Sequence, residues 1–184
     1  MRSRWAKLLV AWPLLVMAAS FAYSQNAYRD AQNGVSLSLP LGWTWTDPQP
    51  SSEQKSIVVF REARTRLEAK LYVQVLQPPE QITPAEKMNR RLLKQARSKV
   101  EQRIREGFQD YRLREESCEL KVINGRSALS WVSEYTASGQ SMAEYLTRVR
   151  SESTSALFYV KLPAEHLDDF KRRLDPIIET LQIR

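Results

Sequence analysis

The residues whose types best suit chemistry surround the single histidine of the sequence. His166 lies beside Glu165 and close to Asp168 and Asp169. One imidazole with these carboxylates could bind a divalent ion, yet acidic residues at the start of a helix also stabilise the positive end of its dipole. We favour the dipole interpretation, because one histidine makes a His-based zinc site or a Ser-His-Asp triad difficult to assemble. The sequence also has no phosphate-binding glycine loop, nucleophile elbow or cysteine pair, so no catalytic, cofactor-binding or metal-binding residue is predicted.

Cys118 is the only cysteine, so the chain cannot form an internal disulfide. Glu116 and Glu119 lie close to it, and nearby carboxylates raise the pKa of a thiol and disfavour the reactive thiolate. We therefore expect a small, unreactive side chain on a strand. An intermolecular disulfide is the open alternative.

The densest basic charge lies between residues 87 and 105, on a predicted helix. Six basic residues stand there against Glu101: Arg90, Arg91, Lys94, Arg97, Lys99 and Arg103. A solvated helix face is the default interpretation of such a run. The alternative is contact with an acidic protein partner or with an anionic envelope surface, where each cation contributes up to roughly 1 kcal/mol. We predict that Arg90, Arg91, Lys94 and Arg97 form the candidate binding surface.

Aromatic residues on predicted strands form the second candidate site. Trp43, Trp45 and Trp131 could line a groove for a peptide or a glycan, although packing in or against a sheet is the default role of such rings. The sequence does not place the three rings together.

The elements that must position these residues follow from the hydrophobic periodicity. Residues 34–45 alternate as a strand with Pro40 and Gly42 as stop signals, and apolar residues 57–60 predict a central strand covered on both faces. Residues 67–75 alternate and complete an antiparallel hairpin with 57–60. Thr83, Pro84 and Glu86 form a capping box that begins a helix, and Gly107 ends it. The helix is expected to carry one apolar stripe: Met88, Leu92, Ala96, Val100 and Ile104.

The second half predicts an antiparallel meander and a last helix. Residues 113–162 form the meander, with tight turns at Asn124-Gly125 and Ser138-Gly139. The last helix begins at Pro163 and carries apolar residues to Leu181, with a kink or break expected at Pro176.

The first 24 residues have the three parts of a secretory signal. Basic residues precede an apolar run that is too short to span a bilayer, and small residues allow cleavage after Ala22 or Ser24. Export is therefore predicted, with an N-terminal membrane anchor as the alternative. Without the three basic residues of this segment, 25 of the 28 remain against 21 acidic ones, a net charge of +4. That modest excess argues against nucleic acid as a partner.

The order of these elements resembles the Mog1/PsbP-like superfamily, which includes bacterial secreted PsbP-like and DcrB-like proteins. The resemblance is carried by Gly34 to Trp43, by Asn124-Gly125-Arg126 with Ala128, and by the closing segments 156–160 and 170–181. It implies an α+β fold, an α/β/α sandwich with a mainly antiparallel sheet. It also implies protein binding without catalysis.

We therefore expect a signal peptide over residues 1–24, a flexible lead-in over 25–33 and one domain over 34–184. The predicted function is that of an exported, non-enzymatic accessory protein of the envelope or extracellular space that binds a macromolecular partner. The alternative is a small-ligand-binding protein or a hydrolase with a pocket near the aromatic sheet face.

Overall fold

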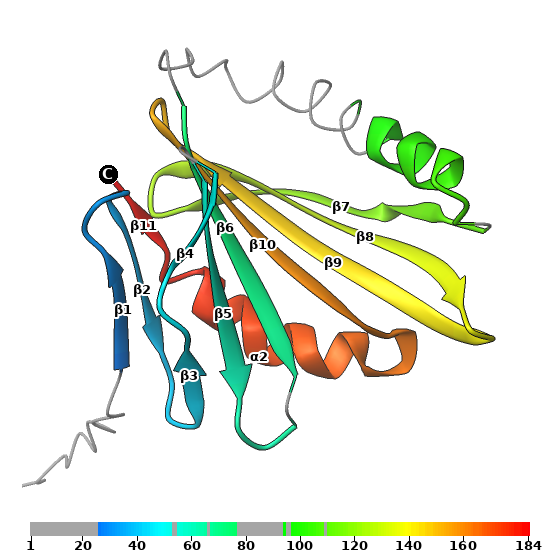
Figure 1. Cartoon of the computed structure of the whole chain (residues 1–184), viewed down its shortest axis with the longest axis horizontal. Coiled ribbons are helices and arrows are strands. Elements are labelled where there is room, and N and C mark those ends of the chain that lie inside the picture. The colour runs from blue at the N-terminus through cyan, green and yellow to red at the C-terminus, as the bar shows by residue number, and fades with distance from the viewer. Residues whose placement is uncertain (1–25, 53–54, 66, 77–93, 95–96, 109) are drawn as a thin grey trace, which may run out of the picture.

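The alternating segments of the sequence form two antiparallel sheets (Figure 1). The structure is a computed structural model that describes residues 26–52, 55–65, 67–76, 94, 97–108 and 110–184. The predicted signal segment, the capping box at Thr83 and the first part of the helix after it lie outside the described residues.

The larger sheet has the order β3-β5-β6-β10-β9-β8-β7, with β4 paired to β5, and the smaller sheet has the order β1-β2-β11. The strands and the last helix have the following bounds: β1 Asn26–Asp30, β2 Val35–Leu39, β3 Trp43–Trp45, β4 Gln49–Ser52, β5 Lys55–Glu62, β6 Glu68–Val75, β7 Arg112–Ile123, β8 Arg126–Ala137, β9 Gln140–Arg150, β10 Thr154–Pro163, the 3-10 turn η1 Ala164–His166, α2 Leu167–Ile178 and β11 Gln182–Ile183.

Helices lie on the two faces of the larger sheet. The apolar residues of α2, such as Phe170 and Leu174, are buried in one core with Phe158 of β10. The neighbouring residue Tyr159 points to the opposite face, where the Lys99 ammonium of helical residues 97–105 lies 5.5 Å from the centre of its ring. This arrangement confirms the predicted α+β sandwich with an antiparallel sheet.

The meander and its two turns form as predicted. Strands β7 to β10 pair in chain order. The turn residues Asn124, Gly125, Ser138 and Gly139 all have positive φ, as a tight hairpin turn of this kind requires. The Asn124 amide group also donates to the main-chain oxygen of Leu181 at 2.9 Å, which fastens this turn to the C-terminal segment.

The lead-in expected over residues 25–33 is wrong for 26–30, which form β1 beside β2. Tyr28 is only 1% exposed, and its ring meets Phe60 edge-on at 5.4 Å. Asp30 then accepts a hydrogen bond from the main-chain nitrogen of Asn33 at 3.0 Å and closes the turn into β2. The segment is too polar for period-two alternation to reveal it, because one buried aromatic ring holds it in the core.

The strand at residues 57–60 forms, but it is not covered on both faces. Val58 and Phe60 are buried in the core with α2, whereas Ile57 and Val59 are only half-buried. The reason is that Ile57 and Val59 lie on the face of the sheet turned away from α2, where Tyr72 and Leu157 of the neighbouring strands are half-buried as well.

The last helix is shorter than the sequence predicted. It ends at Ile178, two residues after Pro176, and Leu181 is buried beyond its end. The two residues that follow form β11, which pairs with β2 and was not predicted. A proline removes one main-chain donor, so a helix end near this position is the expected consequence.

Gly107, with φ of +91°, follows the helix at 97–105 as predicted. The expected apolar stripe is wrong at Ile104, which is 53% exposed. The helix instead directs Lys99 and Arg103 toward the sheet, where aromatic rings and a buried carboxylate receive them.

Candidate functional site

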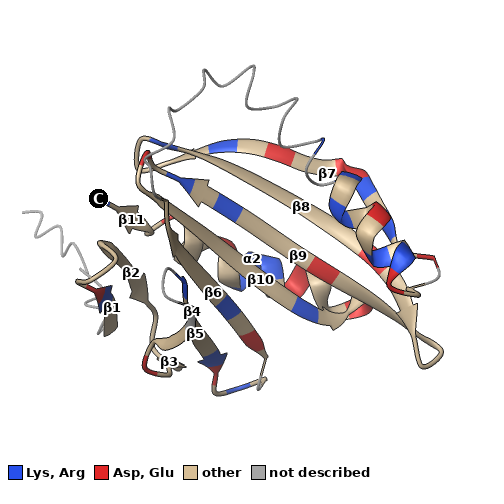
Figure 2. Ribbon diagram, turned by 45° about the horizontal axis from the view of Figure 1, so that its top comes forward, with Lys and Arg blue, Asp and Glu red and all other residues tan. Residues whose placement is uncertain are grey.

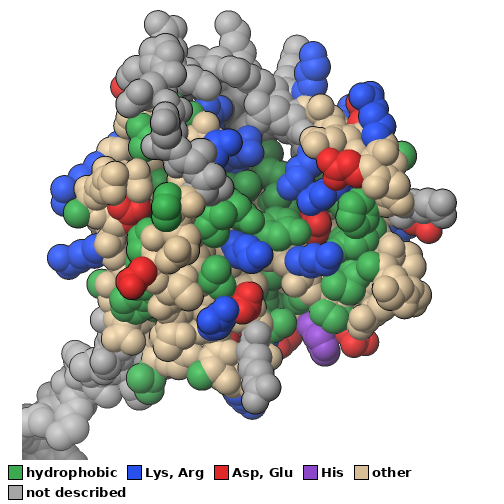
Figure 3. All heavy atoms as spheres, in the orientation of Figure 1, with side chains coloured by type: hydrophobic (Ala, Val, Ile, Leu, Met, Phe, Trp, Pro, Cys, Tyr) green, Lys and Arg blue, Asp and Glu red, His purple; other side chains and the backbone are tan. Residues whose placement is uncertain are grey.

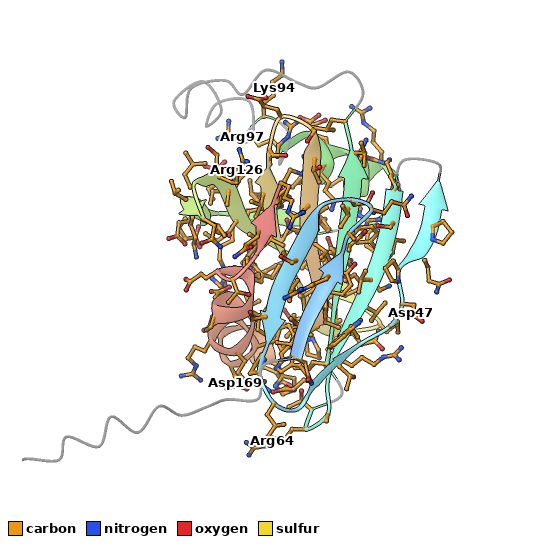
Figure 4. All side chains as sticks on the ribbon, turned by 90° about the vertical axis from the view of Figure 1, so that its left-hand side faces the viewer. Asp47, Arg64, Lys94, Arg97, Arg126 and Asp169 are labelled. Carbon is orange, nitrogen blue, oxygen red and sulfur yellow. The ribbon has the colours of Figure 1, made fainter. Side chains whose placement is uncertain are left out.

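The cations predicted to bind a partner lie only partly within the described residues. Arg90 and Arg91 fall outside them. Lys94 and Arg97 are exposed, and the Arg97 guanidinium forms an ion pair with Glu115 at 2.9 Å. Figure 4 places both side chains at one end of the molecule, with Arg126, and places Asp169 near the opposite end.

The three tryptophans do not line one groove. Trp43 is buried and packs on Phe170 of α2, with 6.0 Å between ring centres. Trp45 is 37% exposed and lies edge-on to Tyr28. Trp131 belongs to a separate cluster with Leu129 and Leu146. Trp43 and Trp131 therefore lie in two different cores and Trp45 lies in neither. The sequence could not separate them, because strand alternation does not say which face of a strand meets which core.

The histidine cluster does not form a metal site among the residues that the structure describes. His166 is exposed, and its Nε2 atom lies 3.6 Å from a carboxylate oxygen of Glu165. Asp168 and Asp169 lie in the first turn of α2, where their charges complement the helix dipole.

The most distinctive surface is the part of the larger sheet that faces away from α2 on β5, β6 and β10, which we call the open face. Strand alternation assigns its side chains: Lys55, Ile57, Val59, Arg61, Glu68, Lys70, Tyr72, Gln74, Ser155, Leu157, Tyr159 and Lys161. Figure 1 shows α2 behind these strands, so that the view looks onto the open face.

An apolar row crosses the middle of the open face. Ile57 pairs with Tyr72, and Tyr72 pairs with Leu157 on the next strand. All three are half-buried. The Tyr72 ring also meets Tyr159 in an edge-on contact at 6.4 Å between ring centres. Figure 3 shows hydrophobic side chains gathered near the middle of this side of the molecule, with Lys and Arg around them.

Three lysines of the open face have no acidic partner in the described part of the chain, although the Lys161 ammonium lies 5.3 Å from the centre of the Tyr135 ring. Lys55, Lys70 and Lys161 form no ion pair among the described residues, whereas Arg61 pairs with Glu68 at 2.6 Å. Lys70 lies between Val59 and Tyr159 in the row next to the apolar one. Figure 2 shows the basic positions along β6, β9 and β10. The open face thus combines half-buried apolar side chains with an excess of positive charge.

A buried carboxylate fastens the neighbouring helical segment to the same face. Glu144 of β9 has a side chain only 3% exposed and accepts hydrogen bonds from the hydroxyls of Tyr111 at 2.7 Å and Tyr159 at 2.8 Å. The Arg103 guanidinium lies 3.8 Å from it. Because both carboxylate oxygens are engaged, Glu144 serves to position these groups and is not a free base.

Burial also perturbs the ionisable groups around Glu144. It lowers the pKa of the Lys99 ammonium, although the carboxylate opposes this. It raises the pKa of Tyr111 and Tyr159, and the charge of Glu144 acts in the same direction on both hydroxyls. Cys118 likewise has a raised pKa, first through burial and then through Glu115, which agrees in direction with the prediction of an unreactive thiol.

A polar surface pocket of about 400 Å³ lies near the end of β8. Its walls include Asp110, Tyr111, Arg112 and Glu134. The Arg112 guanidinium is committed to Glu134 at 2.9 Å. Thr136 and Ser141 also line it, but among the described residues no hydrogen bond joins their hydroxyls to a carboxylate, and the ion pair gives Arg112 and Glu134 a structural role.

The three lysines of the open face were not predicted as a group from the sequence. Lys70 and Tyr72 were visible on the polar face of the strand at 67–75, and Leu157 and Tyr159 on the last strand. What the sequence did not supply is the pairing of β6 with β10, which joins segments that are far apart along the chain.

No family model and no curated protein matches this sequence. Solved structures do match its fold. The solution structure of cyanobacterial PsbP (CyanoP) from Synechocystis sp. PCC 6803 aligns with a TM-score of 0.61 and 15% identity, over 94% of this chain and 100% of that chain. The chain has the Mog1/PsbP-like fold. This confirms the resemblance at the level of the fold.

Two further structures support the Mog1/PsbP-like fold. LpqN of Mycobacterium tuberculosis, described as involved in cell envelope biogenesis, has a TM-score of 0.51 and 12% identity, over 88% of this chain and 91% of that chain. A protein of Bacteroides thetaiotaomicron VPI-5482 has a TM-score of 0.51 and 11% identity, over 86% of this chain and 48% of that chain. Across the described residues, no helix is long and apolar enough to cross a membrane.

Proposed function

We propose that this chain is an exported, non-catalytic accessory protein of the cell envelope that binds a macromolecular partner through the open face. The observation that carries the proposal is the apolar row Ile57–Tyr72–Leu157 with unpaired lysines around it on a rigid sheet. An exposed apolar patch rimmed by polar groups is typical of an interaction site.

The location part of the proposal rests on two supports. The predicted secretory segment at residues 1–24 favours export, with cleavage near Ala22 or Ser24. The fold shared with an envelope-biogenesis protein and with CyanoP favours an accessory role, although a shared fold alone does not define function.

The non-catalytic part of the proposal is supported by the contacts of two titratable groups, Glu144 and Glu134. The carboxylate of Glu144 accepts hydrogen bonds from two tyrosine hydroxyls. The carboxylate of Glu134 forms ion pairs with Arg112 and Arg114. Catalytic acids and bases need a reachable proton and a suitable partner, which neither group offers in this arrangement.

The test is affinity capture of the partner from the native envelope at low and high salt. Reversing Lys55, Lys70 and Lys161 to Glu is expected to lower capture at low salt by about tenfold, because three attractions to an acidic partner become repulsions. The capture by the unaltered chain is expected to fall as salt rises.

A matched control reverses three exposed arginines away from the open face, Arg29, Arg64 and Arg172, and is expected to retain capture. A second variant, Lys94→Glu with Arg97→Glu, tests the rival surface on the helix. Equal capture by the open-face variant and the unaltered chain would refute the proposed site, and loss in the helix variant alone would move it to the helix.

A further inference from the structure

The size of the open face limits what can cover it. Its apolar row spans three adjacent strands, and neighbouring strands lie about 4.8 Å apart, so the row is about 10 Å wide. An α-helix with its side chains is about 10 Å in diameter. The open face therefore has the width of one helix laid on the sheet.

The fold already uses helices to cover this sheet. α2 packs its apolar residues on the opposite face. On the same side as the open face, helical residues 97–105 reach Tyr159 through Lys99. A further helix on β5, β6 and β10 would lie beside this segment, and helices packed side by side have axes about 8–10 Å apart.

The positive charge of the open face favours a helix with acidic residues. Lys55 and Lys161 are exposed at opposite ends of the strands, and Lys70 lies between them. The acidic residues near them are already occupied, since Glu68 pairs with Arg61 and Glu144 is buried. An acidic segment would neutralise three lysines without displacing an existing ion pair.

Resting on the proposed function, we propose that the open face binds an acidic amphipathic helix of a partner protein. The apolar side of that helix packs on Ile57, Tyr72 and Leu157. Its carboxylates lie toward Lys55, Lys70 and Lys161. This is the helix-on-apolar-surface mode of recognition, with anchors three and four residues apart along the bound helix.

The test uses a fluorescein-labelled synthetic 18-residue peptide with a Leu stripe at helical spacing and Glu on its flanks. Fluorescence anisotropy with the purified full chain is expected to show binding that weakens as salt rises. The variant with Lys55, Lys70 and Lys161 changed to Glu is expected to bind the peptide about tenfold more weakly. The variant with the same lysines changed to Gln is expected to fall between the two, and thermal melting checks that both variants fold.

Two control peptides and one vesicle define the contrary outcomes. A scrambled peptide of the same composition tests the stripe, and a peptide with Lys in place of Glu tests the charge. The proposal would be overturned if the acidic peptide did not bind, or if either control peptide bound as tightly as the acidic peptide. It would also be overturned if the folded lysine variants bound the acidic peptide as tightly as the unaltered chain does. Vesicles of anionic phospholipid bound in preference to the peptide would also overturn it, in favour of a membrane surface.

The proposed function and the inference of a helical partner can be refuted separately. If the acidic peptide does not bind but lysine reversal still abolishes capture of the native partner, the helix inference is wrong and the proposed function stands. If lysine reversal leaves capture intact, the open face is not the binding site at all.

Discussion

Replacing Phe170 with alanine is expected to lower the free energy of unfolding by about 4 kcal/mol, the middle of the range for a fully buried phenylalanine. The side chain is 0% exposed and lies between α2 and the sheet, with Trp43 at 6.0 Å between ring centres. The substitution removes apolar area from the core and leaves a cavity that rigid strands cannot close. Urea unfolding followed by circular dichroism measures the change.

Arg172→Ala on the same helix is the matched control. Arg172 is exposed and its ion pair with Asp169 is a surface pair, so its loss is expected to change stability by no more than about 0.5 kcal/mol. A Phe170→Ala chain as stable as the Arg172→Ala chain would show that α2 does not pack on the sheet as described.

The second large effect is expected at alkaline pH. Burial raises the pKa of Tyr28, Tyr111, Tyr145 and Tyr159 above the usual value of about 10, and nearby carboxylates add to the shift. The folded state therefore favours the neutral phenol. Below pH of about 10 this contribution to stability is fully present, and it is lost as the pH rises further because only the unfolded chain ionises freely.

The expected slope is a loss of about 1.4 kcal/mol per pH unit for each tyrosine that stays protonated in the folded chain. Urea unfolding at intervals from pH 8 to 11 measures it, and phenolate absorbance reports the ionisation directly. Tyr145→Phe is expected to make the slope shallower, because it removes one buried proton. Phenolate absorbance near pH 10 as large as that of the urea-unfolded chain, in a chain that remains folded, would contradict the burial of these rings.

Local signals in the sequence predicted most of the fold, because each has a short-range physical cause. The Asn124-Gly125 turn needs positive φ at both residues and has it. Gly107 follows the end of the helix at 97–105. The alternation over residues 67–75 places Ala69, Leu71 and Val73 in the core with α2 and leaves Lys70 and Tyr72 on the open face.

The errors arose where contacts distant in the sequence decide the outcome. β1 forms because Tyr28 lies in the core beside Phe60, and no periodic pattern in the sequence indicates that contact. Ile104 is exposed because Glu144, forty residues later, draws Arg103 toward the sheet. The candidate site was not predicted from the sequence for the same reason, since the open face exists only when β5, β6 and β10 lie side by side.

Binding through the open face is tested by site-specific photo-crosslinking in cells, with benzoylphenylalanine in place of either Tyr72 on the open face or Asp168 on the exposed side of α2. We expect a discrete adduct from position 72, which reversal of Lys55, Lys70 and Lys161 to Glu removes, and no such adduct from position 168. Adducts of the same partner from position 168 alone, or an adduct from position 72 that persists in the reversed variant, would contradict binding through the open face.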